Sequence, residues 1–294
     1  MNVGFIGLGR MGQAMAGRIL DAGHDLLVSD PVPGQTTSLE DAGAVAVGSA
    51  VAATQDRDVV ISMLPSDGAL DAVLHSDGGL IEGMAASCIH MASGTHGVPA
   101  INAAAQAHAD AGQTFIACPV LGRPDLAAQG LIKVVPAGPS GAVDKVLPVL
   151  DAIGQQTFRA GPDPQSAAAV KIANNFLLGC AIENMGEALS LVEKLGVEPQ
   201  LFFEVMTQGL FSAPAYEVYG KFIVDKNWDS HGATAVIGLK DADLALEAAE
   251  VANVPLPSTA VWRAYLQSAV DRGEGHLDWA VMALEQARAS GLEK

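Results

Sequence analysis

GFIGLGRMGQAM, at residues 4–15, is the stretch that decides the fold. The apolar residues before its glycines are predicted to form a strand, and a helical pattern follows them. Within the GxGxxG spacing, Gly7 permits a tight turn, Gly9 leaves room for a pyrophosphate, and Gly12 lets the helix pack closely on the strand. The first N–H groups of such a helix bind phosphate oxygens. The stretch therefore predicts a dinucleotide-binding unit, whose expected cofactor contacts are Gly7, Leu8, Gly9, Arg10, Met11 and Gly12.

A single carboxylate predicts which dinucleotide is bound. The next predicted strand ends at Asp30, where a carboxylate would accept hydrogen bonds from the adenosine ribose hydroxyls. No Lys or Arg occurs between Asp30 and Arg57 that could neutralise a 2′-phosphate. We therefore expect NAD(H) in preference to NADP(H). The alternative is that Asp30 is only a solvated turn residue before Pro31, and Arg10 either flanks the pyrophosphate or is exposed.

The first half of the chain alternates short apolar runs with helical segments, which is typical of a doubly wound parallel sheet covered on both faces. Strands are predicted at 3–6, 26–29, 59–63, 87–91, 114–117 and 132–136. Helices are predicted at 11–22, 99–111 and 142–153, ending at Gly23, Gly112 and Gly154.

The pattern changes after residue 162. A helical pattern without internal proline continues from 165 to 195. Its two interior glycines, Gly179 and Gly186, would mark places where another segment packs closely on this helix. A helix of about 30 residues spans about 45 Å and would connect two domains. The sequence thus predicts an α/β fold with an NAD-binding, doubly wound domain at 1–162, an interdomain helix at 163–195 and an all-α domain at 196–294. Helices in that last domain are predicted near 199–207, 234–252, 258–272 and 279–290.

Composition narrows the class of protein. The 294 residues carry 33 acidic and 16 basic side chains, a net charge of −17, which disfavours nucleic acid and anionic membrane surfaces as partners. No apolar stretch approaches the ~20 residues of a spanning helix, and the start of the chain lacks the features of a signal peptide. Three widely spaced cysteines are poor material for a disulfide framework or a metal site. We expect a cytoplasmic enzyme that acts on a small molecule.

Two lysines are candidates for chemistry. In KIANN, at 171–175, Lys171 and Asn175 are one helical turn apart, so their side chains share a face. A lysine and an amide that converge on a hydroxyl can exchange its proton and hold its oxygen. A second lysine, Lys240, follows in GLKD. The alternative is that both lysines are solvent-exposed charges and that Asn175 is a cap or kink residue.

Five ordered blocks resemble the β-hydroxyacid dehydrogenase family, which contains 3-hydroxyisobutyrate dehydrogenase, tartronate semialdehyde reductase and the cofactor domain of 6-phosphogluconate dehydrogenase. They are GFIGLGRMGQAM, MLP at 63–65, ACPVLG at 117–122, KIANN, and LKDADLA at 239–245. The resemblance implies a Rossmann fold for the domain at 1–162 and makes the domain at 196–294 the substrate and dimerisation domain. The assembly that it implies is a homodimer or dimer of dimers, in which Lys171 is the acid/base catalyst, Asn175 orients substrate and Lys240 lies near the nicotinamide. It also implies cofactor contacts by Leu64, Pro65 and Ser93.

Two motifs depart from the family pattern. The usual Asp-x-Ser-Thr resembles HMAS at 90–93, where Ser93 keeps a hydroxyl, and the usual Ser-Gly-Gly resembles LGR at 121–123. The resemblance places the acid group of a substrate near Ser93 and Gly122. Arg123 either forms a bidentate pair with that group or points to solvent.

The altered motifs leave two kinds of reaction open. One is reversible oxidation of a 3-hydroxy acid, and the other is reduction of an imine or another carbonyl. Lys171 and Asp30 argue against imine reductases, which generally lack that lysine and favour NADP. A protein that only sensed nucleotide would be expected to have lost the lysine or the glycines.

Overall fold

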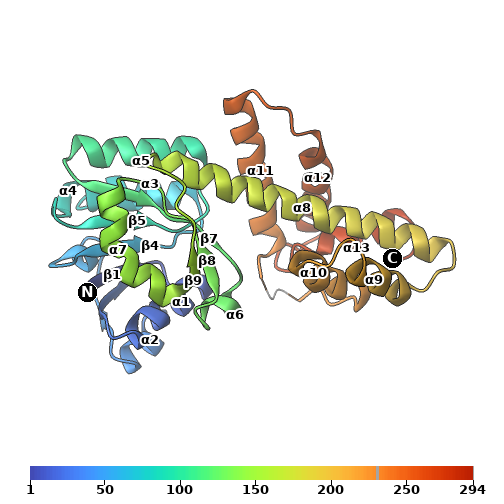
Figure 1. Ribbon diagram of the computed structural model, residues 1–294, viewed down its shortest axis with the longest axis horizontal. Helices are drawn as coiled ribbons and strands as arrows, with labels where there is room; N and C mark the ends of the chain where they lie inside the picture. Colours follow the sequence, from blue (N-terminus) through green and yellow to red (C-terminus); the bar gives the residue numbers. More distant parts are fainter. Residues whose placement is uncertain (230–231, 294) are drawn as a thin grey trace. The chain divides into compact units, whose positions relative to one another are not determined.

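The computed structural model describes residues 1–229 and 232–293 of the chain. Contacts divide it into two units, Met1–Lys171 and Ile172–Lys294. The long helix α8 (Pro164–Lys194) runs through this division (Figure 1). Each unit has a hydrophobic core of its own.

A six-stranded sheet forms the centre of the first unit. Its order is β3-β2-β1-β4-β5-β6, with all neighbouring strands parallel. The strands are β1 (Asn2–Ile6), β2 (Asp25–Ser29), β3 (Val45–Ala46), β4 (Val59–Ser62), β5 (Ile89–Ala92) and β6 (Thr114–Ala117). The winding direction reverses between β1 and β4, so ligands are expected in the crevice at the carboxyl ends of these two strands. The predicted doubly wound sheet is confirmed.

Helices cover both faces of this sheet (Figure 1). On one side lie α1 (Arg10–Asp21), α2 (Thr37–Asp41) and α7 (Ser140–Ile153); on the other lie α3 (Asp67–His75), α4 (Leu80–Gly83) and α5 (Val98–Asp110). The strands carry apolar side chains on both faces of the sheet, because successive side chains enter opposite hydrophobic cores. Phe5, for example, packs on the α1 side and Ile6 on the α3 side.

The predicted strand at 132–136 forms, but in another sheet. It is β8 (Ile132–Val134), which pairs antiparallel with β7 (Val120–Leu121) and parallel with β9 (Gly154–Thr157). The expectation that it extends the parallel sheet was therefore wrong. The sixth strand of the parallel sheet is instead β3. This strand has only two residues, which is too few to give a sequence pattern.

The second unit is helical, as predicted. Its helices after α8 are α9 (Pro199–Gln208), α10 (Pro214–Val224), α11 (Ala235–Ala252), α12 (Pro257–Asp271) and α13 (Val281–Ala289). A Cβ atom on Gly179 would lie 2.8 Å from Trp262, and one on Gly186 would lie 2.9 Å from Ala283. Both glycines thus mark close helix packing, as expected. None of the described helices is long and apolar enough to cross a membrane.

A chain of polar side chains is buried on the α5 side of the sheet. The Nε2 atom of His90 lies 2.8 Å from the Ser62 hydroxyl, and its Nδ1 lies 2.8 Å from Nε2 of His108. The Nδ1 atom of His108 lies 2.8 Å from Oε1 of Gln113, whose amide nitrogen donates to three main-chain carbonyls around α4. Because this carbonyl oxygen can only accept, both neutral imidazoles carry their proton on Nδ1.

The buried imidazoles predict acid sensitivity. Burial lowers the pKa of His90 well below 6.5 and that of His108 to about 4. Because the unfolded chain binds these protons near pH 6.5, this contribution to stability is complete above that pH and is lost as the pH falls. We expect His108 to cost on the order of 2–3 kcal/mol of unfolding free energy by about pH 4.5.

Urea unfolding of wild type and His108→Leu checks this expectation. The variant carries no imidazole at this position. The difference in unfolding free energy by which it is less stable than wild type should therefore shrink as the pH is lowered from about 7 to about 4.5. A deficit that stays constant over this range would contradict the assignment.

Candidate active site

The three glycines of the first loop have three different roles. Gly7 has φ +90°, and a Cβ on it would lie 2.4 Å from the Met63 carbonyl oxygen. A Cβ on Gly12 would lie 2.0 Å from the Gly7 carbonyl oxygen, whereas one on Gly9 would project into open space. Gly9 is also the N-cap of α1, and no side chain caps that helix. The loop therefore fits a pyrophosphate that approaches at Gly9 and accepts from the helix N-terminus.

Asp30 connects the carboxyl ends of β1 and β2. One of its oxygens accepts a hydrogen bond of 2.6 Å from the Leu8 N–H, and the other accepts one of 2.8 Å from the Val32 N–H. The contact with Val32 is the turn interaction expected of an aspartate before proline, but the contact with Leu8 was not predicted. A carboxylate has about four acceptor positions, so Asp30 can hold the glycine loop and still accept from ribose hydroxyls.

Loops after β4 and β5 lie on the other side of the crevice. Leu64 and Pro65 follow β4, and Ser93 follows β5, where its N–H donates to the Ser62 carbonyl at 2.8 Å. The Ser93 hydroxyl is buried and has no hydrogen-bond partner among the described residues. A buried hydroxyl without a partner is costly, so this atom fits a polar ligand group. The crevice thus fits the predicted dinucleotide on both sides.

A polar cluster lies in the helical unit. The side-chain amide of Asn175, on α8, donates a hydrogen bond of 2.7 Å to Asp241, on α11. The Lys240 ammonium lies 3.1 Å from the other oxygen of Asp241, whose side chain is only 5% exposed. Asn175 is itself buried. The carboxylate therefore fixes the amide and gives the lysine a counter-charge.

Asp241 was missed by sequence reasoning. It directly follows Lys240 in LKDADLA, where an aspartate beside a lysine is ordinarily a surface pair. The signal that could have found it is the apolar register of α11, which buries Gly238, Asp241 and Ala242 alike. A carboxylate at a buried register position requires partners.

Lys171 and Asn175 lie on the same helix, α8, four residues apart. Side chains at this spacing are neighbours on one face. Lys171 is half-buried. Their arrangement along the helix is the one that the proton-transfer hypothesis requires.

Arg123 is paired within the protein, so its guanidinium neither points to solvent without a partner nor is available for a substrate carboxylate. Its Nε and Nη2 atoms donate to the two oxygens of Asp125 at 3.1 and 2.7 Å. These hydrogen bonds lower the pKa of the Asp125 carboxyl. The preceding Gly122 has φ +148°, and a Cβ on it would lie 2.7 Å from Ile132, so the loop conformation depends on glycine. A substrate carboxylate would have to displace Asp125 from the guanidinium.

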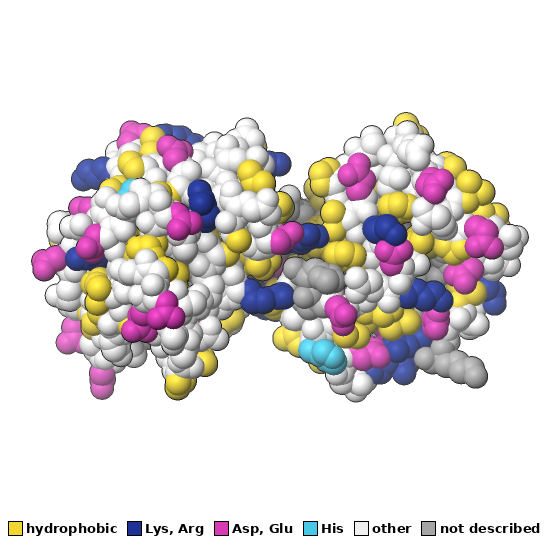
Figure 2. All heavy atoms as spheres, turned by 90° about the horizontal axis from the view of Figure 1, so that it is seen from below, with side chains coloured by type: hydrophobic (Ala, Val, Ile, Leu, Met, Phe, Trp, Pro, Cys, Tyr) yellow, Lys and Arg dark blue, Asp and Glu magenta, His cyan; other side chains and the backbone are white. Residues whose placement is uncertain are grey.

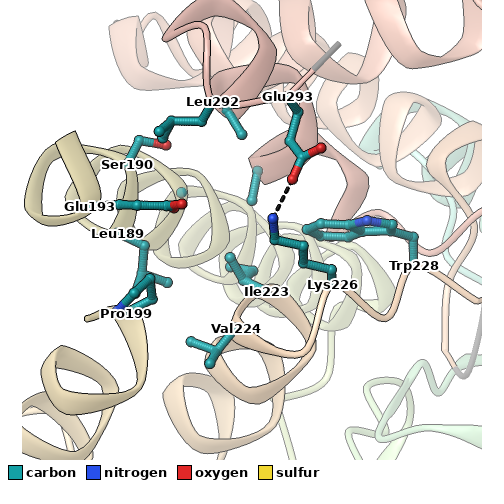
Figure 3. A pocket seen from close by; sticks show the side chains of 13 residues that line it. Leu189, Ser190, Glu193, Pro199, Ile223, Val224, Lys226, Trp228, Leu292 and Glu293 are labelled. Atoms are coloured by element: carbon teal, nitrogen blue, oxygen red, sulfur yellow. Dashed lines mark hydrogen bonds and ion pairs between the residues drawn. The ribbon is translucent and has the colours of Figure 1, made fainter. Parts of the chain in front are cut away.

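A pocket in the described chain lies elsewhere in the helical unit. It encloses about 500 Å³ including its mouth, and its walls come from α8, α10, α13 and the residues after them. Figure 3 shows the Lys226 ammonium paired with the Glu293 carboxylate beside Trp228. None of the predicted catalytic or cofactor residues lines it. It is therefore not the candidate active site.

Surface charge affects how a substrate approaches. In Figure 2, Asp and Glu side chains are spread over the face in view, with Lys and Arg side chains scattered among them. The net charge of the chain is −17. An anionic substrate is repelled at long range by such a protein, so the cations closest to the bound substrate must supply its attraction.

Two family models match the chain. One, described as the NAD binding domain of 6-phosphogluconate dehydrogenase, matches residues 2–161, and the other, described as NAD-binding of NADP-dependent 3-hydroxyisobutyrate dehydrogenase, matches residues 166–284. The uncharacterized oxidoreductase YfjR of Bacillus subtilis is 37% identical and the alignment covers 96% of this chain and 98% of that protein.

Relatives with assigned activities are similar over the same span. The NAD-dependent L-serine dehydrogenase of Pseudomonas aeruginosa is 32% identical, with 95% of this chain and 96% of the relative covered. The crystal structure of 3-hydroxyisobutyrate dehydrogenase from Salmonella typhimurium has a TM-score of 0.86 at 26% identity, covering 97% of this chain and 99% of the other.

Proposed function

Because the chain belongs to the β-hydroxyacid dehydrogenase family, we propose that it oxidises a small 3-hydroxy acid to the semialdehyde or ketone, reversibly. The matches support NAD(P)-dependent oxidation of hydroxy acids. L-Serine and 3-hydroxyisobutyrate, the compounds named for two relatives, both carry a hydroxyl on the carbon β to a carboxylate. This shared chemistry supports a 3-hydroxy acid as the substrate class.

The observation that carries the proposal is the fixed amide on the lysine-bearing helix. Asn175 is buried and anchored by Asp241, and its amide nitrogen retains a second N–H that can donate to a substrate oxygen. Lys171, on the same face of α8, would accept the hydroxyl proton during oxidation and return it during reduction. When bound, NAD⁺ supplies the acceptor for the hydride that leaves the hydroxyl-bearing carbon.

The remaining predicted residues bind and orient. We propose that Gly7 through Gly12 hold the pyrophosphate, that Asp30 accepts from the adenosine ribose, and that Leu64, Pro65 and Lys240 contact the nicotinamide half. Ser93 and Gly122 would hold the acid group. Arg123 would contribute only where the substrate carboxylate replaces Asp125 on its guanidinium.

A substrate screen tests the proposal. Purified protein is assayed by NADH absorbance with 3-hydroxy acids, with their uncharged amides and, in the reducing direction, with cyclic imines, each with NAD(H) and NADP(H). Turnover of 3-hydroxy acids supports the proposal. Turnover of imines alone would replace it by imine reduction, and equal rates for acids and amides would exclude a carboxylate contact.

Asp30 predicts the cofactor preference. We expect kcat/KM to be higher with NAD⁺ than with NADP⁺, because a carboxylate beside the adenosine ribose would repel a 2′-phosphate. The hydrogen bond from the Leu8 N–H to Asp30 supports this assignment, since it holds the carboxylate beside the glycine loop. Asp30→Ala should raise the KM for NAD⁺ about tenfold, since a charged hydrogen-bond partner is lost, and should narrow the gap between the cofactors. Equal use of both cofactors by the wild type would contradict this assignment.

We also propose that the chain forms a homodimer or a dimer of dimers through its helical unit. Large apolar side chains are exposed there around α9, among them Leu201, Val205 and Leu210 at 55%, 63% and 96%. Leu201 and Val205 are four residues apart on α9 and share a face, and contiguous apolar exposure is characteristic of association surfaces.

A further inference from the structure

Two loops at the carboxyl edge of the sheet are tied together by the hydrogen bonds of one carboxylate. The first follows β4 and leads into α3, whose first residue is Asp67; the second follows β5 and leads into α5. The Asp67 carboxylate accepts from Nδ1 of His96, in the second loop, at 2.9 Å, and from the Gly97 N–H at 3.1 and 3.2 Å. One carboxylate at the start of a helix thus holds the loop of the neighbouring strand.

The imidazole in this pair is enclosed. The side chain of His96 is 0% exposed, while that of Asp67 is 33% exposed. Nδ1 of His96 carries the proton that it donates to the carboxylate, and its Nε2 is buried with no hydrogen-bond partner among the described residues. Burying an imidazole with one unpaired nitrogen costs free energy that an apolar side chain would not cost.

The ring also fixes a close approach of the two loops. A Cβ on Gly94 would lie 2.4 Å from Nε2 of His96 and 2.6 Å from the Leu64 carbonyl oxygen. The backbone at Gly94 is therefore enclosed by the imidazole on one side and the β4 loop on the other. Ser93, whose buried hydroxyl lacks a partner, is the adjacent residue.

We propose that Asp67 and His96 form a latch that holds the nicotinamide half of the dinucleotide site in its binding geometry. The latch joins the loops that carry Leu64 and Ser93, and neither latch residue needs to touch the cofactor. Both are positioning residues, and the inference rests on the proposed assignment of these loops to the nicotinamide half. The glycine loop and Asp30 follow β1 and β2, so the adenosine half does not depend on the latch.

Two ligands separate a latch from a general structural role. The affinities of NADH and of ADP-ribose, which lacks the nicotinamide, are measured by titration calorimetry for wild type, His96→Leu, Asp67→Ala and His96→Asn. We expect His96→Leu and Asp67→Ala to raise the Kd of NADH about tenfold, because a charged hydrogen bond is lost, and to change that of ADP-ribose by less than about twofold. An asparagine amide can donate near the place of Nδ1, so His96→Asn should restore most of the NADH affinity.

Asp30→Ala is the matched control, since it should weaken both ligands together. Equal losses of NADH and ADP-ribose affinity in His96→Leu would overturn the proposal, and so would an unchanged NADH affinity. A variant that fails to fold is replaced in this comparison by His96→Gln, which keeps a polar side chain but moves its donor away from Asp67. A wild type that binds NADH but turns over no hydroxy acid would refute the proposed function and leave the latch standing.

Discussion

Replacing Lys171 by alanine is expected to lower kcat by about 10²–10⁴-fold, the usual contribution of a general acid/base. The hydroxyl proton would then have no acceptor on the α8 face that also carries Asn175. The Kd of NADH should change by less than about twofold, because the predicted pyrophosphate and ribose contacts belong to the loops after β1 and β2. Single-turnover rates and NADH titrations measure the two quantities separately.

Lys194→Ala supplies the matched control, because Lys194 is an exposed lysine in the last turn of the same helix. It removes one positive charge from α8 without touching the proposed site and should leave kcat unchanged. Small primary amines added to Lys171→Ala should restore part of the rate, since they can take the place of the missing base. A Lys171→Ala variant with near-normal kcat would show that another group transfers the proton.

Local patterns in the sequence were sufficient for the glycine loop and for the long helix. The glycines at 7, 9 and 12 have requirements that follow from short-range geometry, and each requirement appears in the structure as a positive φ, an open space or a near contact. The long run without internal proline that forms α8 is likewise a local signal. Such features depend on neighbours within a few residues along the chain, so a single sequence is enough to predict them.

Contacts across the fold were not predictable in the same way. Asp241 meets Asn175 over 66 residues of sequence, and His96 meets Asp67 over 29. Charged residues at these positions look like surface residues until the packing of the helices and loops is known. Arg123 and Asp125 are only two residues apart, yet the sequence alone did not show that the guanidinium pairs with this carboxylate.

Asp241→Ala is expected to lower kcat by about 10²-fold although the residue itself transfers no proton. The variant removes the acceptor that holds the Asn175 amide at 2.7 Å and the counter-charge 3.1 Å from Lys240. A displacement of about 1 Å in an orienting group can cost about 10²-fold in rate. Asp241→Asn keeps an acceptor for the amide but loses the charge, so its kcat should fall less than that of Asp241→Ala.

A double-mutant cycle shows whether Asp241 acts through Asn175. If it does, Asn175→Ala combined with Asp241→Ala should lose little more activity than Asn175→Ala alone, because the two residues contribute through one contact. Asp243→Ala is the control on the same helix, since Asp243 is half-exposed and pairs with Arg263; it should leave kcat unchanged. Fully additive losses in the cycle would place the effect of Asp241 on Lys240 instead. An Asp241→Ala variant that has the unfolding free energy and the kcat of wild type would show that Asp241 has no role in the site.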